Sequence, residues 1–183
     1  MSAAAPVAPV NTGDLKERVA AYLKKDPLAM TPIMARELGA SEAEVIRAFP
    51  ADQVTELNIA DGKATELIKT FEKLGRVHVI ATNDACTLEG YGYFGGFSLT
   101  GPFFNVQTDT LDMHIRHQAL ASAFSVIKPS HQYGQTTYSV QFFTKEGKSG
   151  FKVFLYKSVT EKEGGNVQAV IQTWKDITAQ FKK

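Results

Sequence analysis

The sequence predicts a mixed α+β protein in which helices at both ends flank a large antiparallel β-sheet. Apolar residues recur at helical spacing in the first 75 residues, alternate from residue 76 onward, and return to a helical stripe after Asn166. The predicted strands follow one another without long helices between them, which favours antiparallel pairing. With 44% hydrophobic and 21% charged residues, the composition is that of a globular protein.

Three parts are predicted along the chain. Residues 1–13 are rich in Ala, Pro and Val, have no periodic pattern, and are expected to form a disordered tail. Residues 14–75 are expected to form an N-terminal helical region with a helical hairpin. Residues 76–183 are expected to form the antiparallel β-sheet domain with a C-terminal helix.

The composition also bounds the compartment. The tail lacks the positively charged start of a signal peptide and any apolar run long enough to span a bilayer. Cys86 is the one cysteine of the sequence and cannot form an internal disulfide, which suits a reducing compartment. These features predict a cytoplasmic protein without membrane insertion.

Four helices are predicted before the sheet, each with start and stop signals. They are expected to begin at Asp14, Thr31, Ser41 and Asp61 and to end before Pro27, at Gly39, before Pro50 and near Gly75. One N-terminal signal is a capping box of Ser41 and Glu44. A last helix starts at Asn166 and carries an apolar stripe of Val167, Val170, Ile171, Trp174, Ile177 and Phe181.

Eight short strands are predicted between the fourth helix and the last one. They cover residues 77–81, 86–90, 96–100, 103–107, 111–117, 121–127, 137–144 and 151–156. The last two are joined by a charged, glycine-containing turn that indicates a hairpin. So many strands leave exposed edges, and a homodimer that pairs or covers them is expected.

The second and third helices resemble a helix-turn-helix, and a DNA-binding regulator is therefore one alternative. DNA affinity depends on several Lys or Arg side chains that contact phosphates. The helix after Ser41 instead carries Glu42 and Glu44, with Arg47 as its cation, and the formal net charge of the chain is +1. This pattern favours a packed helical hairpin and no nucleic-acid partner.

Residues that could bind a ligand gather in the predicted strand 111–117. Alternation places Asp112, His114 and Arg116 on one face and the apolar residues on the other, with His114 and Arg116 about 7 Å apart. His117 falls on the core side, where a structural role is expected. An imidazole can ligate haem iron and a guanidinium can hold a propionate, whereas the plain alternative is a solvated polar strand face. No serine lies in a Gly-x-Ser-x-Gly motif, and no catalytic residue is assigned.

Several motifs resemble, in order and spacing, the cytosolic haem-utilisation proteins of the HutX/ChuX family. They are Phe-Phe-Asn-Val at 103–106, Met-His-Ile-Arg at 113–116, residues 142–148 and residues 151–155. Upstream, Leu-Gly-Arg-Val at 74–77 is similar to the start of the family's domain. The resemblance covers most of the chain after the tail.

The resemblance implies a homodimer whose sheets form a saddle, and a carrier that stores haem and passes it to a haem-degrading partner. The histidine of the family's Gly-His-Ile-Lys motif corresponds to His114, and the family's lysine to Arg116. Phe103 stands where the family has a tyrosine, so phenolate ligation is lost at that position. Tyr133 is an alternative oxygen ligand.

The sequence thus leads to a cytosolic haem-binding protein without enzymatic activity, with haem as bound cargo. His114 is the candidate axial ligand of the iron, Arg116 and Lys128 are candidate propionate partners, and Phe104 and Tyr133 are candidate pocket walls. Alternatives from other classes are an enzyme that degrades or deferrates haem and, less favoured, the helix-turn-helix regulator.

Overall fold

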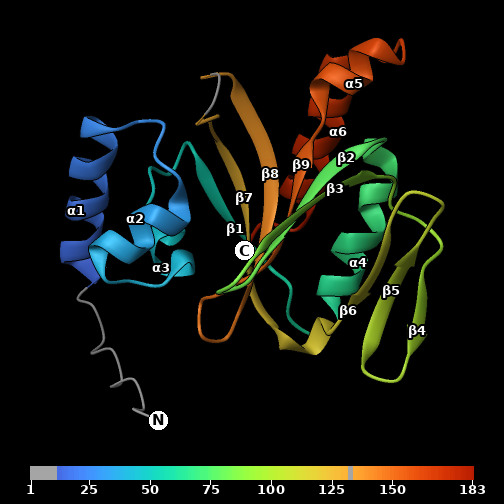
Figure 1. Ribbon diagram of the computed structural model, residues 1–183, viewed down its shortest axis with the longest axis horizontal. Helices are drawn as coiled ribbons and strands as arrows, with labels where there is room; N and C mark the ends of the chain where they lie inside the picture. Colours follow the sequence, from blue (N-terminus) through green and yellow to red (C-terminus); the bar gives the residue numbers. More distant parts are fainter. Residues whose placement is uncertain (1–11, 132–133) are drawn as a thin grey trace.

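The computed structural model describes residues 12–131 and 134–183, and Figure 1 shows their arrangement. The helices are α1 (Thr12–Lys25), α2 (Thr31–Leu38), α3 (Glu42–Arg47), α4 (Lys63–Thr70), α5 (Lys157–Lys162) and α6 (Val167–Gln180), with 3-10 helices η1 (Phe71–Leu74) and η2 (His117–Ala119). The strands are β1 (Val54–Leu57), β2 (Val77–Thr82), β3 (Thr87–Gly92), β4 (Ser98–Thr100), β5 (Phe103–Gln107), β6 (Asp112–Ile115), β7 (Leu120–Pro129), β8 (Thr136–Thr144) and β9 (Ser149–Leu155). The predicted α+β class, with a large antiparallel sheet and a C-terminal helix, is confirmed.

The strands form two antiparallel sheets. A six-stranded sheet has the order β1-β7-β8-β9-β2-β3, and a three-stranded sheet has the order β4-β5-β6. The smaller sheet and the N-terminal helices lie at opposite sides of the molecule (Figure 1). The strand predicted to carry the ligand-binding residues, β6, belongs to the smaller sheet and not to the large one.

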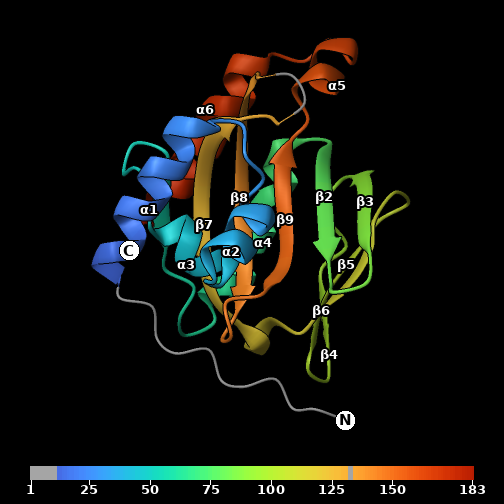
Figure 2. The same ribbon diagram turned by 60° about the vertical axis from the view of Figure 1, so that its left-hand side comes forward.

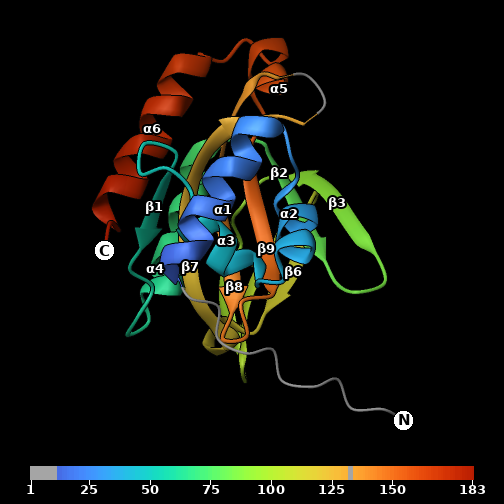
Figure 3. The same cartoon turned by 90° about the vertical axis from the view of Figure 1, so that its left-hand side faces the viewer.

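Each face of the large sheet has its own helical cover, because side chains alternate along every strand. One face packs on α4, η1 and α6 in a core that includes Leu67, Phe71, Val140, Phe142, Val153 and Trp174. The other face receives α3, where Ile46 packs with Phe124 and Phe143. Figures 2 and 3 show α1, α2 and α3 lying over β7, β8 and β9 on that second face. The sheet is therefore the middle layer of the molecule.

The predicted capping box at the start of α3 is present. The Ser41 backbone N–H donates to Glu44 Oε2 at 2.8 Å, and the Glu44 N–H donates to Ser41 Oγ at 3.3 Å. The β8–β9 turn packs directly against this cap, and a Cβ on Gly147 would lie 2.3 Å from Ser41 Oγ. Gly147 also has a φ of 73°, so both space and backbone conformation require glycine here.

A buried ion pair fastens the helical hairpin to the sheet. Lys152 of β9 and Thr31 of α2 both donate to Glu42 Oε1, at the start of α3. The three residues are 8%, 6% and 9% exposed, respectively. The Lys152 ammonium and the Glu42 carboxylate neutralise each other in this buried position, where an unpaired charge would be unfavourable. The acidic start of α3 thus serves packing, as expected for a structural hairpin.

The structure differs from the sequence prediction in several elements. The strand β1 was not predicted: it lies in the region expected to be helical and pairs with β7. Its outer edge is closed by the C-terminus, since the Lys183 N–H donates to the Glu56 carbonyl. The strand is four residues long with two polar positions, too short for its alternation to stand out. The helix α5 was also missed.

Three predicted boundaries are wrong. The first helix begins at Thr12, inside the expected tail. The fourth helix is capped by Gly62 in a left-handed conformation, and Asp61 precedes this cap with a φ of 53°. The strand predicted over residues 111–117 ends at Ile115, and His117 lies in η2. Residues 1–11 lie outside the described part, and the division at residue 75 stays a prediction.

Trp174→Ala is expected to cost about 3–5 kcal/mol of the free energy of unfolding, because it removes a large buried side chain. Trp174 is 2% exposed, and its indole packs edge-on against Tyr138 at 5.3 Å between ring centroids. Urea unfolding measures the loss. The exposed neighbour Lys175, changed to Ala, is the matched control for the helix. A loss below about 1 kcal/mol would show that the stripe contributes little packing.

Lys152→Met is expected to destabilise the fold by about 3–5 kcal/mol, because it leaves the Glu42 carboxylate buried without its partner. The double variant Glu42→Gln/Lys152→Met should recover most of that loss. Lys148→Met, which breaks the exposed pair with Asp84, should cost less than about 1 kcal/mol. If Lys152→Met costs as little as Lys148→Met in urea unfolding, the ion pair does not hold the hairpin.

Candidate functional site

The candidate site is set by the pairing of β5 with β6. Asn105 is opposite His114, and Phe104 is opposite Ile115. Paired residues point to the same face of a sheet, and successive residues point to opposite faces. Phe104 and Ile115 are 1% and 6% exposed and belong to the core, so the face that carries His114 is the outer one.

One ring nitrogen of His114 is hydrogen-bonded to Asn105, and the other lies near the carboxylate of Asp112. Its Nδ1 is 2.8 Å from Asn105 Oδ1, and its Nε2 is 3.6 Å from Asp112 Oδ1. The side chain is 57% exposed. The alternation predicted for this strand holds from Asp112 to Ile115, because Asp112 and His114 are exposed while Ile115 is buried. His114 can therefore meet a ligand that approaches from solvent.

A phenyl ring and a guanidinium adjoin the imidazole. The rings of Phe103 and His114 are 6.3 Å apart in an edge-to-face arrangement. Arg116 is exposed, and its guanidinium carbon lies 5.6 Å from the centre of the Phe103 ring. Arg116 follows the end of β6 and is not part of the strand, but its contact with Phe103 keeps it on this face. The surface formed by Phe103, Asp112, His114 and Arg116 is called the β5–β6 face below.

Phe104 and Lys128 do not join this face. Phe104 points into the core, where it stacks on Phe97 at 5.6 Å between ring centroids. Lys128 lies near the end of β7 that is remote from η2, and its Nζ donates to the backbone carbonyls of Ala29 and Pro129, each at 3.1 Å. Burial lowers the pKa of the Lys128 ammonium; the nearby Asp26 carboxylate raises that pKa and Lys152 lowers it.

The remaining predicted residues are placed as follows. Tyr133 lies outside the described residues. His117 was expected to face the core from a strand, and it is instead a half-buried residue of η2, because β6 ends two residues earlier. Sequence reasoning missed Asn105 as a partner of His114. The two lie on different strands, and only the strand register shows that they meet.

A separate aromatic cluster that includes one histidine lies near the edge of the large sheet. His78 stacks on Tyr91 of β3 at 4.5 Å between ring centroids, and its Nε2 is 2.8 Å from Glu89 Oε2. Tyr156 packs on the same tyrosine at 4.8 Å. These are cross-strand contacts of an edge hairpin, which stabilise β3 on β2. They explain His78 as a structural residue.

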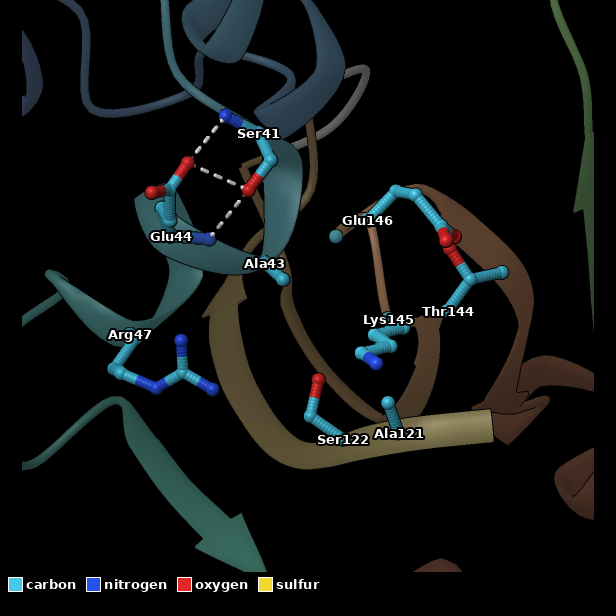
Figure 4. A pocket seen from close by; sticks show the side chains of 10 residues that line it. Ser41, Ala43, Glu44, Arg47, Ala121, Ser122, Thr144, Lys145 and Glu146 are labelled. Carbon is cyan, nitrogen blue, oxygen red and sulfur yellow. Dashed lines mark hydrogen bonds between the residues drawn. The ribbon is translucent and has the colours of Figure 1, made fainter. Parts of the chain in front are cut away.

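A polar crevice of about 320 Å³ lies between α3 and the β8–β9 turn (Figure 4). Ser41 and Glu44 bond to each other on its wall, and Arg47 and Lys145 line it. The Arg47 guanidinium is paired with Glu56 at 3.2 Å. Most of the residues that line the crevice are polar or charged. The crevice contains none of the predicted haem-site residues.

Two further findings concern the described part of the chain as a whole. Within residues 12–131 and 134–183, no group of three or more His, Cys, Asp or Glu side chains is arranged to hold a metal ion. Across the same residues, no helix has the length and apolar character needed to cross a membrane.

Fold and site together define a small α+β protein that presents an imidazole, a guanidinium and a phenyl ring on the outer face of a three-stranded sheet. The chain belongs to the haem utilisation ChuX/HutX family, whose model matches residues 58–176. Of the predictions made from the sequence, this membership is confirmed directly. The matched segment includes the whole β5–β6 face.

Named relatives and solved structures agree with this assignment. The chain is 26% identical over 149 residues to the intracellular heme transport protein HutX of Vibrio cholerae. The alignment covers 77% of this chain and 72% of HutX. The crystal structure of ChuX has a TM-score of 0.75 at 20% identity and covers 91% of this chain and 96% of its own. The heme-degrading enzyme ChuS of Escherichia coli O157:H7 has a TM-score of 0.76 at 20% identity over 94% of this chain, which spans 48% of ChuS. The structural likenesses show the fold.

Proposed function

We propose that the protein is an intracellular haem carrier that binds haem as cargo on the β5–β6 face. Membership of the haem utilisation family and the likeness to a heme transport protein support this function. The observation that carries the site is the exposed imidazole of His114 beside Phe103 and Arg116. These three side chains match the three chemical parts of haem.

Each side chain has a role that follows from its chemistry. The Nε2 atom of His114 is the axial ligand of the iron, since an imidazole nitrogen is a common haem ligand. Arg116 pairs with a propionate, and a guanidinium suits a carboxylate because it can donate two parallel hydrogen bonds. Phe103 contacts the porphyrin, where each Å² of apolar surface removed from water contributes about 25 cal/mol before the costs of association.

The exposure of the face suits a carrier. A ligand bound at the surface of a three-stranded sheet can be reached by a second protein without opening the core of the first. We therefore propose that the bound haem passes to a haem-degrading acceptor. Lys128 and Phe104, which do not lie on the β5–β6 face, have no direct role in this proposal.

A second candidate function is haem degradation, because the fold is shared with ChuS, which is described as a heme-degrading enzyme and as a heme oxygenase. Catalysis would need turnover of the bound haem when a reductant is supplied. Loss of the Soret band with ascorbate under air, together with release of iron, would favour this function. A stable haem spectrum under the same conditions favours the carrier.

His114→Ala is expected to change the Soret spectrum of the haemin complex and to weaken haemin binding, because it removes the axial nitrogen. Titration of the purified protein with haemin, followed by absorbance, measures both effects. His131→Ala removes another exposed imidazole and is the matched control; it should leave spectrum and affinity unchanged. If the wild-type protein binds no haemin, the proposed function itself is wrong.

The arginine variants separate ligation from charge pairing in the same titration. Arg116→Ala should weaken haemin binding and leave the spectral type unchanged. Arg116→Lys keeps the cation but loses the two parallel hydrogen bonds, so its haemin affinity should lie between those of Arg116→Ala and the wild type. An unaltered spectrum for His114→Ala would show that another side chain ligates the iron. Tyr133→Phe is then the next variant to test.

We also propose a homodimer, because the large sheet has an open edge at β3. The opposite edge at β1 is joined by C-terminal residues, while on β3 Leu88 and Tyr91 are 64% and 40% exposed. Sedimentation equilibrium should give twice the chain mass of 20.0 kDa, and Leu88→Lys should shift it toward the monomer. Leu99→Lys, at an equally exposed residue of β4, is the control. A single 20.0 kDa species across micromolar concentrations would contradict the dimer.

A further inference from the structure

The side chain of Asn105 is polar and buried at the centre of the three-stranded sheet, with 4% of the residue exposed. It lies between β4 and β6 and contacts both. Its Nδ2 donates to Ser98 Oγ at 3.0 Å and to Thr100 Oγ1 at 3.1 Å. Its Oδ1 is 2.8 Å from His114 Nδ1. The amide is therefore bonded on both of its ends.

The structure places the amide nitrogen of Asn105 toward the two hydroxyls and its oxygen toward His114. An amide nitrogen has two hydrogens, and Ser98 and Thr100 provide an acceptor for each of them. The amide oxygen is then the atom that faces His114, and an oxygen can only accept. It follows that Nδ1 of His114 carries the hydrogen in this contact.

The position of that hydrogen decides what the other ring nitrogen can do. A neutral imidazole with its hydrogen on Nδ1 has a lone pair on Nε2, the nitrogen that a metal can use. In this arrangement Nε2 is the atom not bonded to Asn105. The carboxylate of Asp112, 3.6 Å from Nε2, would favour the opposite tautomer, because a carboxylate accepts hydrogens. The contact of Nδ1 with Asn105 is 2.8 Å long and that of Nε2 with Asp112 is 3.6 Å long, so the Asn105 contact is the shorter of the two.

We propose that Asn105 is a positioning residue, which holds His114 in the Nδ1–H tautomer and keeps the lone pair of Nε2 available to a haem iron. The assignment of iron as the ligand of Nε2 rests on the proposed function. The tautomer itself is a property of the protein without haem. Ser98 and Thr100 belong to the same hydrogen-bond network, because their hydroxyls accept from the Asn105 amide nitrogen.

The tautomer is measured directly in the haem-free full chain by NMR, with long-range proton–nitrogen correlation spectra of ¹⁵N-labelled histidine. The His114 resonances are assigned from the spectrum of His114→Ala. We expect the nitrogen-bound hydrogen of His114 on Nδ1 in the neutral imidazole. A hydrogen on Nε2 in the wild-type protein would overturn the proposal.

Variants at Asn105 test the cause. Asn105→Leu removes the acceptor and should shift His114 to the Nε2–H tautomer, with haemin affinity about 10-fold to 100-fold weaker, as for other partners of metal-bound histidines. Asn105→Asp keeps an acceptor and should retain the Nδ1–H tautomer and affinity within a few-fold of the wild type. If both variants leave the hydrogen on Nδ1, Asn105 does not set the tautomer.

A second variant avoids any disturbance of the buried position. Ser98→Ala/Thr100→Ala changes two exposed residues and keeps Asn105, but it frees the amide to turn, so a mixture of His114 tautomers is expected. Asp112→Asn is the matched control on the other side of the ring and should leave the Nδ1–H tautomer in place. A pure Nδ1–H signal in the double variant would contradict the role of the hydroxyls.

The two proposals can fail separately. If the tautomer responds to the Asn105 variants but His114→Ala leaves the haemin spectrum unaltered, Asn105 positions the imidazole and the assignment of His114 as haem ligand is wrong. If haemin binding requires His114 but every variant at Asn105 keeps wild-type affinity and tautomer, the haem site stands and the positioning role of Asn105 is wrong.

Discussion

The register of β5 against β6 is the constraint on which the site depends. Because Asn105 pairs with His114 and Phe104 with Ile115, one pairing decides both what enters the core and what faces solvent. A shift of β6 by one residue would pair His114 with Phe104 or Val106 and turn the imidazole toward the core. The burial of Phe104 at 1% exposure therefore holds the register that exposes the imidazole. Packing and function are coupled through a single ladder of hydrogen bonds.

The large sheet supplies a rigid frame for this small one. Its core is continuous with the small sheet, since Phe104, Val106 and Ile115 pack in the same cluster as Phe71 and Phe142. The N-terminal helices stabilise the opposite face through Ile46 and through the buried contact of Glu42 with Lys152.

The sequence predicted well wherever the signal was local. The capping box at Ser41, the strand Phe103–Gln107 and the start of the last helix at Asn166 each depend on residues close together in the chain, and all three are present. The exposure of His114 followed from alternation within one strand. Membership of the haem utilisation family was also predicted, from motifs that each lie within a few residues.

Predictions that depended on distant contacts did less well. Phe103 and Phe104 are adjacent aromatic residues, so the sequence could not show which of them faces the core; pairing with Ile115 decides it. Lys128 was predicted to be a propionate partner, yet it lies near the far end of β7, where its Nζ donates to the carbonyl of Ala29 between α1 and α2. The strand β1 is stabilised by partners on both edges, β7 on one and the C-terminal residues on the other. Its own four residues contain no signal that predicts these partners.

We propose that haem iron binds Nε2 of His114 on an outer sheet face that Asn105 and the β5–β6 register prepare. A crystal structure of the haemin-bound full chain tests it most directly. We expect iron bonded to Nε2 of His114, with Phe103 against the porphyrin and a propionate next to Arg116. Iron bonded to another side chain, with His114 still turned toward solvent, would contradict it.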